Sequence, residues 1–427
     1  MKKYLVGGAV RDRLLGFPVT ERDWVVVGET PESMLAKNYR PVGKDFPVFL
    51  HPETHEEYAL ARTERKTAPG YKGFAIHATP DVTLEEDLKR RDLTINAMAM
   101  SSDGRLIDPY GGQQDLKNRL LRHISPAFSE DPVRVLRVAR FAARYGHLGF
   151  AIAAETRELI EQMVDNGEVD YVVPERVWAE TVKALSEKTP TAYFETLRSC
   201  GAQAVIFPEL DALFGVPQPA AYHPEIDTGL HSLMVLHQAA KLSDKALVRF
   251  AALVHDLGKA ATPREQWPHH HGHEQQGLPI LGDFCRRLRV PKQFNRLAHH
   301  VMRYHSHCHR AFALRPATIV DMLAAMGMFK AHADLNDFLL ACTADARGRA
   351  GLENSAYPQA DFLHKAQQAG MAVDTAAVMD LNLRGPEIGK AIREQRIRAI
   401  KSVQSCMRSK YSDALPKSPS PSGRRPG

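Results

Sequence analysis

Two glycines and two carboxylates near the start of the chain have the types and spacing needed for phosphate chemistry. Gly7 and Gly8 lie in VGGAVRDRLL, and Glu21 and Asp23 precede the apolar run WVVV. Backbone N–H groups without side-chain bulk can approach a phosphate closely. We expect both carboxylates on one strand, where residues two apart share a face, and their oxygens suit Mg²⁺. The combination predicts a site for nucleotidyl transfer.

Two further polar segments could bind a nucleotide. The first, KRRDLTINA, places Arg91 and Asp92 before a predicted helix that carries Asn96. An arginine fork binds phosphate in bidentate fashion, although a solvated charge run is an alternative. A three-residue repeat in the second segment places four charged residues on one slanted helical stripe: Asp131, Arg134, Arg137 and Arg140. Such a stripe repels itself unless anions or carboxylates face it, and a surface basic helix is the alternative.

Histidines and aspartates form a third constellation in the second half of the chain. His231, the adjacent pair His255 and Asp256, and then Asp345 follow the order H…HD…D within helix-forming sequence. Imidazole nitrogens combined with carboxylate oxygens favour a transition metal over Mg²⁺, and such an ion can activate water against a phosphoester. A histidine-rich solvated surface is the alternative, because runs such as PHHHGHE occur here, but the adjacent pair favours the metal site.

Length and composition limit the class of protein. The 427 residues suffice for about two to four domains, and a net charge of +6 permits a nucleic-acid partner without requiring one. Five cysteines without a CxxC pair indicate free thiols in a reducing compartment. No run approaches the ~18–20 apolar residues of a membrane span, and the apolar start breaks at Arg11, too early for a signal peptide. We therefore expect a cytoplasmic protein that does not bind membranes.

Apolar periodicity predicts the elements that position these residues. Short β-rich runs alternate with helical stretches over residues 1–140; the runs are Tyr4–Val6, Trp24–Val27, Val48–Leu50 and Tyr58–Ala61. The stretch between Arg65 and Pro80 is predicted to be a mobile loop. Helical patterns follow over residues 141–225, 226–350 and 351–412, and the Pro- and Ser-rich tail, residues 413–427, is predicted to be disordered. Arginines of the 351–412 region could contact RNA or form a solvated face.

The order of the N-terminal motifs resembles that of the class II tRNA nucleotidyltransferases, the CCA-adding enzymes, whose relatives include bacterial poly(A) polymerases. The resemblance covers residues 1–225 and rests on GGAVRD, the acidic pair, RRDLTINAMA, DPYGGQQD, EDPVRVLRVARF and PERVWAE. It implies an α+β, polymerase β-like head followed by an all-α neck and body. The chain departs from the family's usual Asp-x-Asp, because Glu21 precedes Asp23.

This resemblance implies a role for each polar residue of the first half. Glu21 and Asp23 would be catalytic and hold Mg²⁺, and Glu57 would supply a further strand carboxylate. The triphosphate of ATP or CTP would contact Gly8, Arg11 and Arg91, and Asp92 and Asn96 would organise the sugar or the local turn. Asp131 and Arg134 would form a protein template for C and A, with Arg137 and Arg140 continuing that surface toward the phosphates. The predicted mobile loop would switch the site from CTP to ATP.

The second half resembles the all-α HD superfamily of metal-dependent phosphohydrolases over about residues 228–350. The resemblance implies that four residues bind a divalent transition metal such as Ni²⁺, Mn²⁺ or Co²⁺: His231, His255, Asp256 and Asp345. His273 and His305 fall where some relatives bind a second ion. The implied activities are those of a phosphatase, a 2′-nucleotidase and a 2′,3′-cyclic phosphodiesterase.

Together the two resemblances predict a CCA-adding enzyme fused to an HD phosphohydrolase. It would add CCA to the 3′ end of tRNA from CTP and ATP, release pyrophosphate, contact the acceptor region, and act as a monomer or weak homodimer. A poly(A) polymerase is an alternative that would be expected to carry a strongly basic C-terminal extension. A CC-adding or A-adding enzyme, and an RNA- or nucleotide-binding regulator with degenerate sites, are the others.

Overall fold

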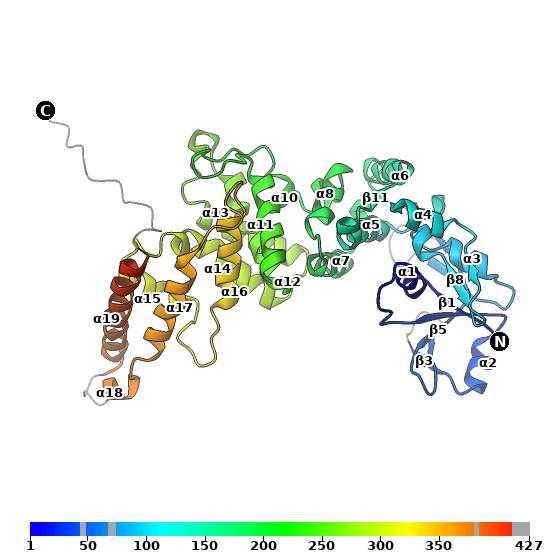
Figure 1. Cartoon of the computed structure of the whole chain (residues 1–427), viewed down its shortest axis with the longest axis horizontal. Coiled ribbons are helices and arrows are strands. Elements are labelled where there is room, and N and C mark those ends of the chain that lie inside the picture. Colours follow the sequence, from blue (N-terminus) through cyan, green and yellow to red (C-terminus); the bar gives the residue numbers. More distant parts are fainter. Residues whose placement is uncertain (43–47, 67–73, 380–383, 412–427) are drawn as a thin grey trace. The chain divides into compact units, whose positions relative to one another are not determined.

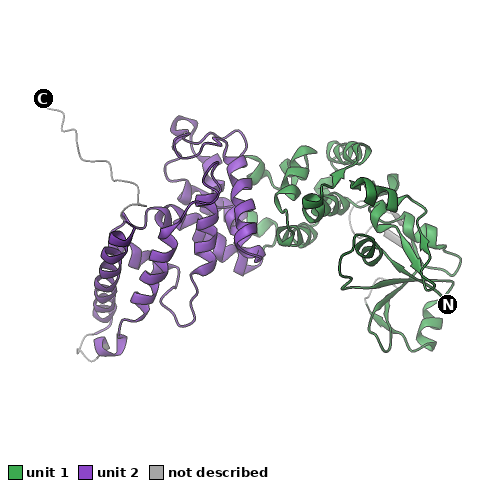
Figure 2. Ribbon diagram, in the orientation of Figure 1, with its two compact units in different colours: residues 1–212, 284–290 green, residues 213–283, 291–427 purple. Residues whose placement is uncertain are grey.

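The computed structural model of the chain describes residues 1–42, 48–66, 74–379 and 384–411. These residues belong to two compact units, one formed by residues 1–212 and 284–290 and the other by residues 213–283 and 291–427 (Figure 2). A mixed sheet lies in the first unit, and helices make up most of the remainder (Figure 1). The predicted fold class, an α+β head followed by all-α parts, is confirmed. The tail predicted to be disordered lies outside the described residues.

A seven-stranded mixed sheet forms the centre of the head, in the order β3-β4-β5-β2-β1-β8-β9. Its strands are β1 (Lys2–Val6), β2 (Asp23–Val27), β3 (Arg40–Val42), β4 (Val48–Leu50), β5 (Glu57–Leu60), β8 (Ala99–Ser101) and β9 (Leu106–Ile107). Strand β2 pairs antiparallel with β1 and parallel with β5. All four strands predicted from the sequence are present, each within two residues of its expected limits.

Strand β2 is buried on both faces, which explains its continuous apolar run. Val25 packs in one core cluster with Val6, whereas Val26 packs in another with Tyr58 and Met34. A central strand held from both sides is a rigid support for the polar residue at its start. The helices of the head are α1 (Gly8–Leu14), α2 (Pro31–Ala36), α3 (Leu84–Lys89) and α4 (Gly112–Asn118).

The segment predicted to be a mobile loop is partly a strand pair. Strands β6 (Thr63–Lys66) and β7 (Phe74–His77) pair antiparallel, so the prediction is wrong for these residues. The intervening residues 67–73 lie outside the described part of the chain. The proposed role of this segment in nucleotide switching stays a prediction.

Helix α5 (Val133–Tyr145) is the buried centre of the helical part of the first unit, and it packs against α7 and α8. It runs through the predicted limit of the head at residue 140. Arg134 and Arg140 are only 8% and 9% exposed, so the alternative of a solvated basic helix is wrong. The neighbouring elements are α6 (Ala154–Asp165), α7 (Pro174–Ser186), α8 (Thr191–Ser199), α9 (Ala202–Ile206), α10 (Pro208–Asp211) and the parallel pair β10 (Leu120–Leu121) and β11 (Ala151–Ile152).

The second half of the chain is helical, as predicted. Its helices are α11 (Thr228–Leu242), α12 (Ala246–Leu253), α13 (His273–Arg287), α14 (Lys292–His309), α15 (Pro316–Ala325), α16 (Asn336–Arg347), α17 (Pro358–Met371), α18 (Thr375–Met379) and α19 (Pro386–Lys410). Helices α11, α12, α14 and α16 pack on one another and carry the histidine and aspartate motifs.

The basic C-terminal helix α19 packs on α15 and α17. Arg393 forms two hydrogen bonds of 2.7 and 2.8 Å with Asp321. Arg396 stacks 4.2 Å from the centre of the Phe329 ring and donates to the carbonyl of Gly370. These arginines are thus engaged within the protein. Among the described helices, none combines the length and apolar character that a membrane span requires.

Candidate active sites

The Gly7–Gly8 turn lets two guanidinium groups approach the start of α1. Gly7 has φ +65°, in the left-handed region that favours glycine. A Cβ at Gly7 would lie 2.8 Å from Nη1 of Arg91, and one at Gly8 would lie 3.4 Å from Nη2 of Arg11. The turn therefore brings together the glycines and the two arginines that the family resemblance assigned to the triphosphate.

The carboxylates of the head lie at or before the starts of two interior strands, β2 and β5, but their arrangement differs from the prediction. Asp23 is the first residue of β2, whereas Glu21 lies in the preceding loop, so the two do not share a strand. Asp23 pairs in register with Val6 of β1 and with Glu57 of β5. The parallel register thus places Glu57 beside Asp23.

The surroundings of Asp23 suit a cation. Its side chain is exposed, yet nearby protein desolvates it enough to raise the pKa of its carboxyl; Arg91 opposes this shift and Glu21 adds to it. Hard oxygen ligands at the exposed end of a rigid strand fit Mg²⁺, which takes one or two protein carboxylates and completes its shell with water and phosphate.

A chain of hydrogen bonds joins the glycine turn to α5. Arg11 donates to Oδ1 of Asn96, and Nδ2 of Asn96 donates to Oδ1 of Asp92 over 2.9 Å. Oδ2 of Asp92 lies 2.7 Å from both Nε and Nη2 of Arg137. Burial alone would raise the pKa of Asp92, but Arg137 and the hydrogen bonds lower it to about 2. Asn96 lies in a 3₁₀ turn, Thr94–Asn96, rather than in the predicted helix.

Asp131 and Arg134 lie side by side at the start of α5, and both contact other protein groups. Asp131 precedes the helix instead of lying on its stripe. Its carboxylate accepts two hydrogen bonds of 3.1 Å from the guanidinium of Arg176. Arg134 donates to the carbonyls of Ala127 and Arg90 over 2.7 and 2.6 Å. Sequence reasoning missed Arg176, although it lies in the quoted motif PERVWAE.

The other two arginines of the stripe also face carboxylates. Nε of Arg140 donates to Oε2 of Glu180 over 2.6 Å, and its guanidinium lies 4.6 Å from the centre of the Phe141 ring. Arg137 faces Asp92, as described above. The repulsion expected within the stripe is therefore offset by carboxylates from outside the helix. Glu180, also in PERVWAE, was not singled out from the sequence.

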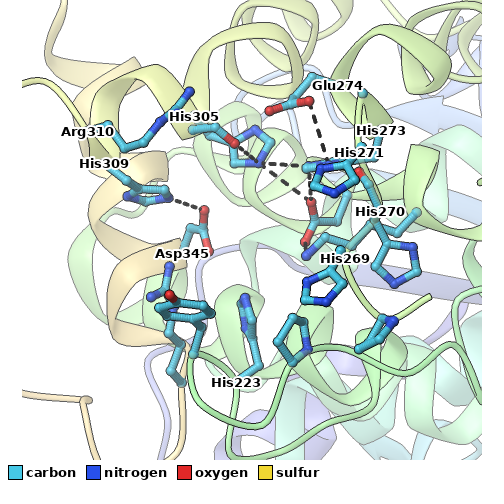
Figure 3. Close-up of a pocket in the computed structure, with 18 residues that line it drawn as sticks. His223, His269, His270, His271, His273, Glu274, His305, His309, Arg310 and Asp345 are labelled. Atoms are coloured by element: carbon cyan, nitrogen blue, oxygen red, sulfur yellow. Dashed lines mark hydrogen bonds and ion pairs between the residues drawn. The ribbon is translucent and has the colours of Figure 1, made fainter. Parts of the chain in front are cut away.

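A second site surrounds a cavity of about 610 Å³ in the other unit (Figure 3). The structure brings together all six residues that the sequence assigned to it. They are His231 on α11, His255 and Asp256 in the turn between α12 and the 3₁₀ helix Leu257–Ala261, His273 at the start of α13, His305 on α14 and Asp345 on α16. The adjacent pair lies in a turn, where the sequence predicted a helix.

Asp256 lies at the centre of this cluster. Its Oδ2 is 3.1 Å from Nε2 of His255 and 2.6 Å from Nζ of Lys259. Its Oδ1 is 3.3 Å from Nε2 of His273 and 3.6 Å from Nε2 of His305. The two oxygens of one carboxylate thus face two different sets of imidazoles.

Asp345 forms the other carboxylate of the cluster. Its Oδ1 lies 3.2 Å from Nε2 of His231 and 3.6 Å from Nε2 of His255. Its Oδ2 accepts a hydrogen bond of 2.6 Å from Nε2 of His309, whose ring points at this carboxylate in Figure 3. Nδ1 of His309 in turn lies 2.8 Å from the hydroxyl of Tyr357. His309 was missed from the sequence, because it lies four residues beyond His305 in a histidine-rich run.

Backbone carbonyls fix the tautomers of the histidines. Nδ1 of His255 lies 2.8 Å from the carbonyl of Ala252, Nδ1 of His273 lies 2.9 Å from that of His270, and Nδ1 of His305 lies 3.1 Å from that of Val301. A carbonyl can only accept, so each Nδ1 carries the proton and each Nε2 presents a lone pair to the cluster.

These lone pairs fit a divalent cation. Nε2 of His273 and Nε2 of His305 lie 3.3 Å apart, and Oδ1 of Asp256 beside them is buried without a hydrogen-bond partner within the described residues. Three acceptors facing one another repel unless a cation or protons lie between them. Burial lowers the pKa of His305 to about 3, which keeps this ligand neutral. The donor set of nitrogen and carboxylate oxygen suits a transition metal.

Charges inside the cluster keep both carboxylates ionised. Burial alone would raise the pKa of Asp256, but His255 and Lys259 hold it well below its usual range. His255 and His309 do the same for the pKa of Asp345. Ionised carboxylates are the protonation state that metal ligands require. Burial alone would lower the pKa of His255, but Asp256 and Asp345 raise it, so a proton competes with a metal ion for its Nε2.

Glu225 lies behind the cluster and was missed from the sequence. Its Oε1 is 2.9 Å from Nδ1 of His231 and 3.0 Å from Nδ1 of His223. Its Oε2 accepts a hydrogen bond of 3.3 Å from the backbone N–H of Ala350. A carboxylate behind a metal-binding histidine fixes its tautomer and ring orientation. The segment HPEIDTG, just before His231, contains both Glu225 and Asp227, so the sequence alone does not single out the carboxylate that supports the histidine.

Comparisons with known proteins divide the chain in the same way. Family models match as a poly A polymerase head domain over residues 3–122, a probable RNA and SrmB-binding site of polymerase A over 149–214, and an HD domain over 228–328. The multifunctional CCA protein of Methylococcus capsulatus is 63% identical over 406 residues, which cover 95% of this chain and 96% of that protein. The chain belongs to the multifunctional CCA protein family.

It is therefore an enzyme, a CCA tRNA nucleotidyltransferase with an HD domain. The multifunctional CCA protein of Thioalkalivibrio sulfidiphilus is 59% identical over 405 residues, covering 95% of this chain and 99% of the relative. This membership decides against the poly(A) polymerase and the non-enzymatic regulator. Both kinds of domain also imply divalent metals.

Solved structures share the fold. An apo form of a CCA-adding enzyme has a TM-score of 0.65 at 20% identity and covers 97% of this chain and 92% of its own. The Thermotoga maritima CCA-adding enzyme complexed with tRNA has a TM-score of 0.61 at 18% identity, covering 96% and 91%. At these identities the likeness shows the fold alone.

Proposed function

We propose that this protein adds the 3′-terminal CCA of tRNA from CTP and ATP, releases pyrophosphate, and hydrolyses phosphoesters at its HD cavity. The observation that carries this proposal is the presence of two different donor sets in one chain: exposed carboxylates beside arginines in the head, and buried imidazoles with carboxylates around the cavity. Similar structures are described as CCA-adding enzymes in complex with tRNA, ATP and CTP, which supports the choice of substrates.

In the head, Asp23 and Glu21 would hold Mg²⁺, with Glu57 beside them as a third carboxylate. The bound ions would activate the tRNA 3′-hydroxyl and neutralise the leaving pyrophosphate. Arg91 and Arg11 would bind the triphosphate at the Gly7–Gly8 turn. Nε of Arg91 is buried without a hydrogen-bond partner in the described structure, so this side chain retains donor capacity.

Base choice would rest on Asp131 and Arg134. An aspartate offers acceptors and an arginine donors, so together they can pair with the edge of cytosine or adenine. Guanine or uracil would leave buried polar groups unpaired, at a cost of about 1–3 kcal/mol each. Arg176 now contacts both oxygens of Asp131, so an incoming base must share or replace one of these bonds.

Arg137 and Arg140 would continue the nucleotide surface in different ways. The side chain of Arg137 is 35% exposed, so it can reach a phosphate while it holds Asp92. The side chain of Arg140 is 10% exposed and held by Glu180, so it would act by positioning α5.

At the HD cavity, His231, His255, Asp256 and Asp345 would hold one divalent transition metal, of which Ni²⁺, Mn²⁺ and Co²⁺ are the candidates. A second ion would bind between Asp256, His273 and His305. Such ions supply Lewis acidity to the phosphorus centre and activate water. Lys259 fixes one oxygen of Asp256. The substrates would be phosphomonoesters, nucleoside 2′-phosphates and 2′,3′-cyclic phosphates.

The functional division would be a head at residues 1–140, a neck and body at 141–225, an HD domain at 226–350 and a C-terminal helical region at 351–412. Five free cysteines, four of them buried, support a reducing cytoplasm. We also propose that the protein acts as a monomer or weak homodimer.

Nucleotide addition is tested with tRNA that ends before CCA. The full-length protein is given CTP, ATP or both, and the products are sequenced. We expect CC from CTP alone and CCA from both nucleotides. A long A tail, or extension that stops at CC with both nucleotides present, would contradict the proposal.

Separate sites are tested with a crossed pair of substitutions. Asp23→Ala should abolish nucleotide addition and leave phosphohydrolysis unchanged, while His255→Ala should do the reverse. Asp165→Ala and His364→Ala, at exposed positions on α6 and α17, are the matched controls. Equal loss of both activities in either variant would show that the sites are not independent.

A further inference from the structure

Arg349 lies in the wall of the HD cavity, and its side chain has no hydrogen-bond or ion-pair partner among the described residues. It lines the cavity together with Asp256 and Asp345 and is half-buried. Its Nε is buried and has no acceptor, and the described residues provide no ion pair to its guanidinium. Arg347, two residues earlier, instead donates to the carbonyl of Ser355 over 3.0 Å. The charge of Arg349 is therefore available to a ligand in the cavity.

The backbone on both sides of Arg349 is fastened to the metal-ligand cluster. The carbonyl of Gly348 accepts a hydrogen bond of 3.1 Å from Nδ1 of His231. The N–H of Ala350 donates to Oε2 of Glu225 over 3.3 Å. The position of the Arg349 Cα is thus tied to the cluster, while no side chain or carbonyl in the described part of the chain accepts a hydrogen bond from its guanidinium.

Glycine is required immediately before this arginine. A Cβ at Gly348 would lie 2.5 Å from Cγ2 and 2.8 Å from the backbone N of Val235, both shorter than the contacts that real Cβ atoms make. The close approach of this segment to α11 places Arg349 at the cavity. The chain therefore places the Arg349 guanidinium, which has no partner among the described residues, in the wall of the cavity that Asp345 also lines.

A phosphate in this cavity needs a cation beyond the metals. Asp256 and Asp345 line the cavity, and carboxylate oxygens offer acceptors but no donors to the non-bridging oxygens of a phosphate group. Lys259 is already bound by Asp256 over 2.6 Å. Arg310 also lines the cavity, beside His309 (Figure 3), but it is exposed to solvent, which screens its charge.

We propose that Arg349 binds the phosphate group of the substrate at the HD cavity. The inference rests on the proposed phosphohydrolase function and names the residue that recognises its phosphate. The guanidinium fork donates two hydrogen bonds to non-bridging oxygens of a phosphomonoester or cyclic phosphate. Because its Nε–H has no acceptor, the side chain can turn toward the phosphate without breaking a protein hydrogen bond.

The test uses the full-length protein loaded with Mn²⁺, as wild type, Arg349→Ala and Arg349→Lys. Arg315→Ala, an exposed arginine of the same unit that does not line the cavity, is the matched control. Five quantities are measured: KM and kcat for a nucleoside 2′-monophosphate, the inhibition constant of inorganic phosphate, Mn²⁺ affinity by calorimetry, and CCA addition.

Arg349→Ala should raise KM and the phosphate inhibition constant together, by on the order of 10- to 100-fold, the worth of a charge-assisted hydrogen bond. The fall in kcat should be smaller, and Mn²⁺ affinity and CCA addition should not change. Arg349→Lys, which keeps the charge but not the fork, should lie between alanine and wild type. Arg315→Ala should match wild type.

Unchanged KM and phosphate inhibition in Arg349→Ala would overturn the inference, and so would a matching loss of Mn²⁺ affinity, which would indicate a structural role. If the alanine variant does not fold, the lysine variant decides in its place by the same readouts. If the wild type hydrolyses nothing while binding Mn²⁺, the proposed function fails. Calorimetric titration of the Mn²⁺-loaded variants with inorganic phosphate then still tests Arg349.

Discussion

Replacing Glu225 with alanine should weaken metal binding by the HD cluster without unfolding its unit. Oε1 of Glu225 lies 2.9 Å from Nδ1 of His231, and its side chain is only 4% exposed. Burial alone would raise its pKa, but His223 and His231 lower it below the usual range, so the group is a carboxylate at neutral pH. The ionised acceptor keeps the proton of His231 on Nδ1 and leaves Nε2 free to bind a metal.

The expected loss of affinity follows from what remains after the substitution. Removing such a carboxylate behind a metal-binding histidine costs about 10- to 100-fold in metal affinity. The carbonyl of Gly348 still lies 3.1 Å from the same Nδ1 and can accept its proton. We therefore expect the lower end of the range, about 10-fold or about 1.4 kcal/mol. Glu225→Gln keeps one acceptor oxygen and should lose less.

The assay is calorimetric titration of chelator-treated full-length protein with Mn²⁺. Glu265→Ala, an exposed glutamate of the same unit, is the control and should bind as wild type does. Thermal unfolding confirms that each variant is folded. An Mn²⁺ affinity in Glu225→Ala equal to wild type would refute the reasoning, and so would an equal loss in the glutamine variant.

Three other predictions concern contacts elsewhere in the chain. Asp92 has a folded pKa of about 2, below its unfolded value of about 3.9, so its pairing with Arg137 stabilises the fold above about pH 4 and is lost as the pH falls toward 2. Asp92→Asn should lower the free energy of unfolding at pH 7 by on the order of 2 kcal/mol and flatten its fall between pH 4 and 2 in denaturant titrations; an unchanged pH profile would contradict this. Gly348→Ala should cost about 1–3 kcal/mol through overpacking against α11, and an unchanged melting temperature would count against that close approach. Arg176→Ala should lower kcat/KM for CTP and ATP about 10-fold, because Asp131 loses two hydrogen bonds, and unchanged kinetics would show that this pair does not position the carboxylate.

The central strands of the head could be predicted because a strand that is buried on both faces has a continuous apolar sequence. The run WVVV is apolar on both faces, as a strand between two core clusters requires. The exact start of β2 could not be predicted, because it depends on pairing with Val6 of β1 and Glu57 of β5. Neither partner is a sequence neighbour of Asp23. A two-residue spacing alone does not say whether Glu21 is hydrogen-bonded into the sheet, and it is not.

The residues that the sequence missed are those whose role depends on a distant partner. Arg176 acts on Asp131, 45 positions earlier, and Glu225 acts on the backbone of Ala350, 125 positions later. Their own neighbourhoods look like an ordinary helix and an ordinary loop. The HD pair could be found, because two adjacent metal-ligand types with partners on both sides are unusual within helical sequence. Its supporting carboxylate could not, because one glutamate carries no such signal.

The two donor sets also fit the proposal that one chain uses two kinds of metal. The carboxylates of the head are exposed oxygen ligands, which bind Mg²⁺ weakly by themselves and gain affinity from the phosphates of the nucleotide. The HD cluster offers imidazole lone pairs whose tautomers are already fixed by backbone carbonyls, so little ordering remains to be done when an ion binds. Nitrogen-rich sites follow the Irving–Williams order and favour later transition metals at far lower free concentrations. With the metals proposed above, abundant Mg²⁺ would bind the site that is completed by its substrate, and a scarce transition metal would be held by the site that is formed before its substrate binds.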